Sequence, residues 1–250
     1  MTTMQRTTTE GPGRVPVDSL RRTASIVGWL FVITYITSIA AKVVFYPPLF
    51  EGDYIVGTDE DARLLWGAFF EVILIIANIG SAVFLFSVLK RQHENLALGF
   101  VAARVMESVF IAVGVLSVLT LVTMRQDYAG AGSTESAGLI PVGDALTALH
   151  GWTFQLGPGF VVGVGNGLIL GYLMYRSGLV PRGMALLGLV GGTLICLSGA
   201  AVMFGIIEAG SAWQLVATIP EFFWELSLGV YLIVRGFKPS PITAGMVDGR

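Results

Sequence analysis

Charged side chains are scarce in this sequence, since Asp, Glu, Lys and Arg make up only 13% of its 250 residues while 54% are hydrophobic. A water-soluble domain of that composition could not cover its apolar surface, so the balance indicates a protein that lies in lipid. A mean hydropathy of +0.75 points the same way. No stretch between the apolar runs reaches the size of a soluble domain, so we expect a single membrane domain.

Residues that commonly carry chemistry are also few. Cys196 is the only cysteine and lies within an apolar run, so the sequence offers neither a disulfide framework nor a cysteine metal site. Of the two histidines, His93 lies in a predicted loop, which excludes a haem held between helices by two histidines. The motifs of zinc proteases, phosphate-binding loops and serine hydrolases are missing. We therefore predict no catalytic residue, no metal site and no cofactor, and nothing indicates nucleic acid as a partner.

Six apolar runs are each long enough to cross a bilayer. They cover residues 24–46, 66–89, 96–123, 145–175, 183–207 and 213–234. The sequence therefore predicts an all-α, polytopic membrane protein with six transmembrane helices in one bundle, over residues 21–238. Residues 1–20 are rich in Thr, Gly and Pro and are predicted to form a disordered tail, as are residues 239–250. Arg21 and Arg22 before the first run imitate a secretory signal, but the run continues to Tyr46, which favours a membrane span.

The basic residues outside the apolar runs are divided unequally between the two ends of the predicted helices. Eleven lie at the end that holds both termini: Arg6, Arg14, Arg21, Arg22, Lys90, Arg91, Arg176, Arg182, Arg235, Lys238 and Arg250. Only Arg63 and Arg125 lie in the loops at the opposite end. Because short cytoplasmic loops are enriched in Lys and Arg, we predict that both termini are cytoplasmic tails, an N-in/C-in topology.

Lys42 lies near the outer end of the first apolar run, where its long side chain can reach the interface. Five charged residues lie deeper inside the runs: Glu71, Arg104, Glu107, Glu221 and Glu225. A charge is costly to bury in lipid, so each is expected to have a partner. Arg104 and Glu107 are three residues apart and Glu221 and Glu225 are four apart, so each pair shares one helix face. At about 1.5 Å per residue, Arg104, Glu107 and Glu225 reach similar depths near the bilayer midplane. We predict that Arg104 and Glu225 are partners there.

Other polar residues extend this set toward the outer face. Glu71 and Asn78 are seven residues apart on the second span, and His150 and Gln155 lie near the beginning of the fourth. Together they suggest a polar funnel that opens outward. Asp144 and His150 could form an acid–base pair, but a histidine at the membrane edge is more commonly an interfacial anchor.

Glycine recurs at four-residue intervals in the fourth span, at Gly159, Gly163, Gly167 and Gly171. This stripe lies along one side of the helix and lets another backbone approach closely. We expect it to pack within the bundle, and a dimer interface is the alternative. Pro158 in the same helix predicts a kink, either as simple shape or as the broken helix of a transport site.

Four stretches carry a family resemblance. They are LLWGAFFEVILIIANIGSAVFLFSVLKRQHENLALGF, ARVMESVFIAVGVLSVLTL, QLGPGFVVGVGNGLILGYLMYRSGLVPRGMALLGLVGG and WELSLGVYLIVRGF. In this order, over about residues 20–238, the chain resembles the bacterial membrane proteins grouped as domain of unknown function 4386. The family pattern matches Glu71, Arg104, Glu107 and Glu225, whereas Glu221 is an addition of this sequence. The resemblance implies a six-helix bundle in the bacterial cytoplasmic (inner) membrane and no defined activity, ligand or cofactor.

These patterns favour a small carrier or proton-linked permease with a polar cluster at the midplane. The expected partners are the lipid bilayer and a small polar or protonatable ligand, and the oligomeric state stays open. A non-catalytic scaffold or sensor component, whose buried charges fix helix packing, is the first alternative, and a lipid-modifying membrane enzyme is the second. The candidate binding residues are Glu71, Asn78, Arg104, Glu107, His150, Gln155, Glu221 and Glu225.

Overall fold

The structure is a computed structural model that describes residues 17–50, 54–56, 60–127 and 133–244. In these ranges all regular secondary structure is helical and there is no strand. Six helical segments are long and apolar enough to cross a membrane: Ser19–Phe45, Asp61–Leu89, Glu94–Asp127, Gly138–Ser177, Arg182–Met203 and Ala212–Val234. The prediction of an all-α protein with six spans is therefore confirmed.

The spans are built from α1 (Val17–Ile39), α3 (Asp61–Leu89), α4 (Glu94–Asp127), α5 (Ser133–Leu156), α6 (Gly171–Ser177), α7 (Arg182–Met203) and α8 (Ala212–Val234). α1 begins before the first apolar run, so residues 17–20, which we expected to belong to a disordered tail, are helical. Residues 1–16 of that predicted tail lie outside the described residues.

Two spans change from α-helix to the wider π-helix partway along. α1 continues as a π-helix over Ala40–Phe45, and α5 continues through the π-helices Gly157–Val161 and Gly163–Leu170 into α6. The second change begins directly before Pro158, which has no N–H to donate to an α-helical ladder. At this proline the helix therefore changes from the α-helical to the π-helical hydrogen-bonding pattern. Such π turns are uncommon in proteins and often occur at functional sites.

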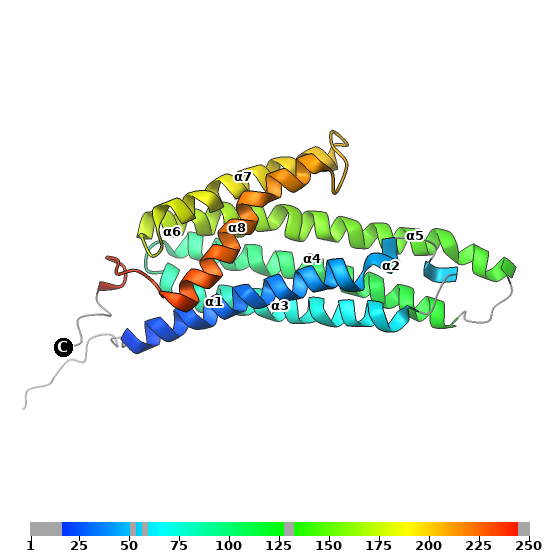
Figure 1. Cartoon of the computed structure of the whole chain (residues 1–250), viewed down its shortest axis with the longest axis horizontal. Coiled ribbons are helices and arrows are strands. Elements are labelled where there is room, and N and C mark those ends of the chain that lie inside the picture. The colour runs from blue at the N-terminus through cyan, green and yellow to red at the C-terminus, as the bar shows by residue number, and fades with distance from the viewer. Residues whose placement is uncertain (1–16, 51–53, 57–59, 128–132, 245–250) are drawn as a thin grey trace, which may run out of the picture.

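The six spans form a closed ring. α1 packs on α3, α3 on α4, α4 on the fourth span, the fourth span on α7, α7 on α8, and α8 on α1 again. Figure 1 shows that α1 begins and α8 ends at the same end of the bundle, which we call the termini end. The opposite end, called the loop end, carries α2 (Pro47–Phe50), the 3-10 helix Tyr54–Val56 and the connection between α7 and α8. Which end faces the cytoplasm stays a prediction.

The interior of the ring is apolar near the termini end. Its core includes Phe31 of α1, Leu85 of α3, Phe100 of α4 and Trp224 of α8, all of them buried. The buried charged side chains of α3, α4 and α8 lie farther toward the middle of the bundle. Apolar contacts therefore dominate the ring near the termini end.

The segment after α8 folds back onto the bundle. The backbone N–H of Lys238 donates to the carbonyl of Leu179 at 2.8 Å, and the hydroxyl of Ser240 donates to the carbonyl of Ser177 at 2.5 Å. Thr243 is buried as well. Residues 239–244 are thus packed, which differs from the disordered tail expected there, because the turn between α6 and α7 supplies polar partners. Residues 245–250 lie outside the described part of the chain.

Candidate functional site

Arg104 lies on α4 inside the ring and is almost completely buried. Its Nη1 is 2.8 Å from Oε2 of Glu107 on the same helix, and its Nη2 donates to Oδ1 of Asn78 on α3 at 2.6 Å. Asn78 Nδ2 in turn donates to Oε1 of Glu107 at 3.1 Å. The three side chains therefore form a closed set of hydrogen bonds between α3 and α4.

Glu225 joins this set from α8. Its Oε1 is 3.9 Å from Arg104 Nη1 and accepts a hydrogen bond from Nδ2 of Asn166, which lies in the π-helix Gly163–Leu170. We call Asn78, Arg104, Glu107, Asn166 and Glu225 the arginine cluster. The predicted contact between Arg104 and Glu225 is present, but Glu107 is the closer carboxylate. The guanidinium therefore joins three spans.

Asn166 was not among the residues selected from the sequence. It is fully buried, and its backbone carbonyl accepts a hydrogen bond from Nε1 of Trp224 at 3.0 Å. The available signal was a single amide among glycines in an apolar span, where a polar side chain is costly without a partner. Its partner Glu225 lies 59 residues away, so spacing alone could not reveal the contact.

Glu221 precedes Glu225 by one helical turn, on the loop-end side, and is also buried. Neither of its carboxyl oxygens has a hydrogen-bond partner among the described residues. The carboxyl group lies against glycines of two other helices, since a Cβ placed on Gly167 or on Gly191 would lie 2.8 Å from Oε2. We call Glu221 with Gly167, Gly191 and Gly192 the glycine niche. Glycine at these positions leaves the space that the carboxyl group occupies.

The glycine stripe of the fourth span faces α7. A Cβ on Gly163 would lie 2.4 Å from Cγ2 of Ile195, one on Gly167 would lie 2.3 Å from Cα of Gly192, and one on Gly171 would lie 3.2 Å from N of Leu189. At the fourth position, Gly159, the contact is looser: a Cβ on Gly199 would lie 3.4 Å from the carbonyl of Gly159. The stripe thus packs within the bundle, the arrangement that we expected from the sequence.

A second polar group, formed by Glu71 and His150, lies nearer the loop end and centres on Tyr46. The hydroxyl of Tyr46 donates to Oε2 of Glu71 at 2.7 Å, and its ring packs edge-on against the ring of His150 with centroids 4.8 Å apart. Nδ1 of His150 lies 3.3 Å from the carbonyl of Gly114. Because His150 is buried, it differs from the interfacial anchor that we expected. Tyr46 was missed because it stands at the end of an apolar run, where aromatic residues are common.

Gln155 points to a different partner. Its Nε2 and Oε1 face the amide of Gln214 on α8 at 3.4 and 2.9 Å, and Gln214 also accepts a hydrogen bond from the backbone N–H of Gly210 at 2.6 Å. The pair therefore connects the fourth span to the start of α8. It belongs to the wall of the bundle and makes no described hydrogen bond to Glu71 or His150.

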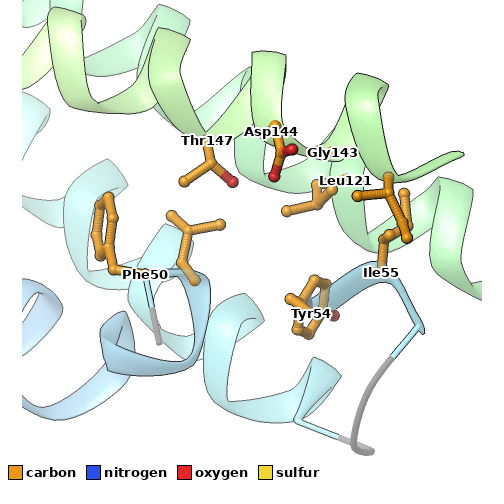
Figure 2. Close-up of a pocket in the computed structure, with 9 residues that line it drawn as sticks. Phe50, Tyr54, Ile55, Leu121, Gly143, Asp144 and Thr147 are labelled. Atoms are coloured by element: carbon orange, nitrogen blue, oxygen red, sulfur yellow. The ribbon is translucent and has the colours of Figure 1, made fainter. Parts of the chain in front are cut away.

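A cavity of about 290 Å³ lies at the loop end. Its lining residues come from α2, the 3-10 helix, α4 and α5: Leu49, Phe50, Tyr54, Ile55, Leu121, Ile140, Gly143, Asp144 and Thr147. Figure 2 shows Asp144 and Thr147 reaching into this space from α5, with Phe50 and Tyr54 on the other side. None of the eight candidate binding residues lines it. The hollow at this end is therefore built from residues other than those of the predicted funnel.

The geometry defines a polytopic helical membrane protein whose ring of spans encloses a polar cluster. Within the part of the chain that the structure describes, no group of three or more potential metal ligands occurs. The chain belongs to the family described as a domain of unknown function (DUF4386), whose model matches residues 26–236. This confirms the resemblance found in the sequence. The comparisons with curated proteins and with solved structures gave no match.

Proposed function

We propose that this integral membrane protein is a small proton-linked carrier in which Glu221 and Glu225 exchange protons in the bundle interior. One observation carries the proposal: Glu221 is buried, yet neither carboxyl oxygen has a hydrogen-bond partner among the residues that the structure describes. An isolated ionised carboxylate is very costly in such surroundings. A carboxyl group in this position is therefore suited to bind a proton and to release it when a positive charge or water arrives.

The charge balance around Glu221 supports this role. Among the described residues, Arg104 is the basic side chain that acts on Glu221, and it already has Glu107 and Glu225 within ion-pair distance. Glu221 thus adds a third carboxyl group with no second cation. Carboxyl groups inside membranes commonly mark proton or ion pathways, and an excess of acids over bases is what proton exchange requires.

The backbone next to the niche supports it as well. Gly167 lies within the π-helix Gly163–Leu170, which also carries Asn166, the hydrogen-bond partner of Glu225. Transporters often place binding sites where a membrane helix loses its regular pattern, since irregular backbone is tolerated there only inside protein or beside water. The interrupted fourth span therefore brings both carboxyl groups to an element of the kind that transport sites use.

A membrane scaffold is the second candidate, and the arginine cluster favours it. Asn78, Glu107 and Glu225 all lie within reach of one buried guanidinium, which ties α3, α4 and α8 together. Buried charge networks of this kind can fix a helix arrangement without transport. In a scaffold, however, the unpartnered carboxyl group of Glu221 would have no role.

Proton flux in liposomes distinguishes the two candidates. We would reconstitute the protein with a trapped pH dye, impose a membrane potential, and add small polar amines, carboxylic acids and sugars one at a time. A carrier gives internal acidification that depends on one compound class and is lost in Glu221→Gln and Glu225→Gln. The matched control is Glu208→Gln, because Glu208 is exposed in the turn at the loop end. If folded protein gives no compound-dependent flux with any class, the carrier proposal is wrong and the scaffold is favoured.

A further inference from the structure

The cavity at the loop end is built from two unlike sides. Leu49, Ile55 and Leu121 form a buried apolar floor. Asp144 and Thr147, three residues apart on α5, add a carboxylate and a hydroxyl on one side. A space of this kind suits a ligand with an apolar body and one polar or charged group.

Asp144, an exposed residue, is the carboxylate that borders this space. It has no ion pair and no hydrogen bond among the described residues. Beside the cavity, Arg125 Nη1 lies 2.6 Å from Oδ1 of Asp61, and the Arg125 guanidinium also lies over one face of the Tyr54 ring, 5.4 Å from its centroid. Tyr54 also donates its hydroxyl to Asp61. Asp144 is thus the one charged side chain among the described residues that line the cavity, and its carboxylate favours a cation over an anion.

Two aromatic rings line the side opposite Asp144. Phe50 and Tyr54 both border the cavity, and Figure 2 shows them across from the carboxylate. The faces of aromatic rings attract cations, and quaternary ammonium groups in particular are bound by aromatic side chains. Rings on one side and a carboxylate on the other match an alkylated ammonium group better than a strongly hydrated metal ion.

The position and size of the cavity limit the ligand further. The fourth span runs over 40 residues, Gly138–Ser177, whereas about 20 cross a bilayer. Its first residues, including Asp144, can thus extend beyond the hydrocarbon to the level of the lipid headgroups or of water. The volume of about 290 Å³ lies at the small end of ligand pockets, so it fits a compact molecule.

We propose that the loop-end cavity binds a small organic cation with an alkylated ammonium group, with Asp144 as its counterion and Phe50 and Tyr54 as its aromatic wall. Thr147 is placed to hydrogen-bond a polar substituent of the ligand. This site is separate from the glycine niche and does not depend on transport, since an ammonium ion can bind here whether or not it crosses the bundle.

The test is equilibrium binding of choline to the full-length protein in detergent, measured by calorimetry. The neutral comparison compound is 3,3-dimethylbutan-1-ol, which has the shape of choline without its charge. We expect choline to bind in the millimolar range or tighter, and the alcohol to bind at least about tenfold more weakly, a difference of ~1.4 kcal/mol. Asp144→Asn should weaken choline binding by a similar factor and leave the weak binding of the alcohol unchanged.

Three further variants locate the site. Gly143→Leu should abolish binding by filling the cavity, because even a Cβ there would lie 3.4 Å from Cδ1 of Ile55. Phe50→Leu should weaken choline binding about threefold through the loss of one ring face. Glu208→Gln, which changes an exposed acid at the same end, should have no effect. Thermal unfolding of each variant would show whether it is folded.

Two results would overturn the proposal: equal binding of choline and the neutral alcohol, or choline binding that Asp144→Asn leaves unchanged. Absence of choline binding to folded wild-type protein at millimolar concentrations would overturn it too. None of these outcomes bears on proton flux through Glu221, so the two proposals can fail separately.

Discussion

Glu221 and Glu225 are one helical turn apart on α8 and share its inner face, yet their surroundings differ. Glu225 accepts a hydrogen bond from Asn166 and lies 3.9 Å from a guanidinium nitrogen of Arg104. Glu221 has no hydrogen-bond partner in the described part of the chain and lies against the glycines of two other helices. The same side chain on one helix therefore has an ion pair and a hydrogen bond in one place and no hydrogen bond from the described residues in the other.

This difference separates two kinds of buried acid. In the arginine cluster, the free energy of burying each charge is offset by a nearby opposite charge and by hydrogen bonds, so removing one member leaves others uncompensated. In the glycine niche no hydrogen bond from the described residues offsets the burial, so removing the carboxyl group takes away a cost. The first kind is expected to stabilise the fold and the second to serve function at the expense of stability.

The largest effect is expected for Arg104→Met, which leaves Glu107 and Glu225 without their cation. Breaking a buried charge pair typically costs about 3–5 kcal/mol of unfolding free energy. We would measure this loss by reversible denaturation in mixed micelles. The double variant with Glu107→Gln should recover more stability than the double variant with Glu225→Gln, because Glu107 is the closer carboxylate at 2.8 Å. Greater recovery with Glu225→Gln would show that Arg104 interacts more strongly with Glu225 than with Glu107.

A smaller loss is expected from Gly167→Ala in the glycine niche. The added methyl group would meet the Gly192 backbone and the Glu221 carboxyl group, and neither can move without shifting a helix. Such overpacking costs about 1–3 kcal/mol, which should appear as a lower midpoint of thermal unfolding. Gly151→Ala is the matched control, since nothing lies within 4 Å of the added carbon. Equal effects of the two variants would show that the niche is not tightly packed.

Replacing each of the two acids by Met tests the comparison directly, because the two changes in unfolding free energy should have opposite signs. Glu221→Met should raise the unfolding free energy by ~1 kcal/mol, because it replaces an unpartnered polar group with an apolar one of similar length. Glu225→Met should lower the unfolding free energy, because it leaves Asn166 without its acceptor and removes one of the two carboxylates near Arg104. If Glu221→Met destabilises as much as Glu225→Met, Glu221 has a stabilising partner and the distinction fails.

A labelling experiment determines the membrane topology. It therefore tells whether Glu221 or Glu225 lies nearer to the outer side of the membrane. With Cys196 replaced by Ala, a cysteine at Ser133 should react with an impermeant thiol reagent on intact cells, and one at Gln92 should not. The excess of basic residues at the termini end is the basis for this expectation. Reaction at Gln92 with no reaction at Ser133 would mean that the niche lies on the cytoplasmic side of the cluster.

Much of this architecture follows from local patterns. The length and hydropathy of the apolar runs predicted all six spans, because crossing a bilayer depends on a continuous apolar segment whatever it packs against. The three-residue spacing predicted that Arg104 and Glu107 share a face, and they form the shorter of the two ion pairs of the cluster. The regular spacing of the glycines likewise predicted a close helix contact before the partner helix was known.

The partners themselves depended on how the helices rotate and pack. Asn166 bonds to Glu225 across 59 residues, and Tyr46 bonds to Glu71 across 25, because the closed ring brings α8 to the fourth span and the segment after α1 to α3. How the helices pack also decides that Glu221 has no hydrogen-bond partner among the described residues and that a cavity lies beside Asp144. Hydropathy and helical period give each residue its depth and its face, since both are properties of one helix. Which side chain stands opposite, or whether any does, is decided only when several helices share the interior.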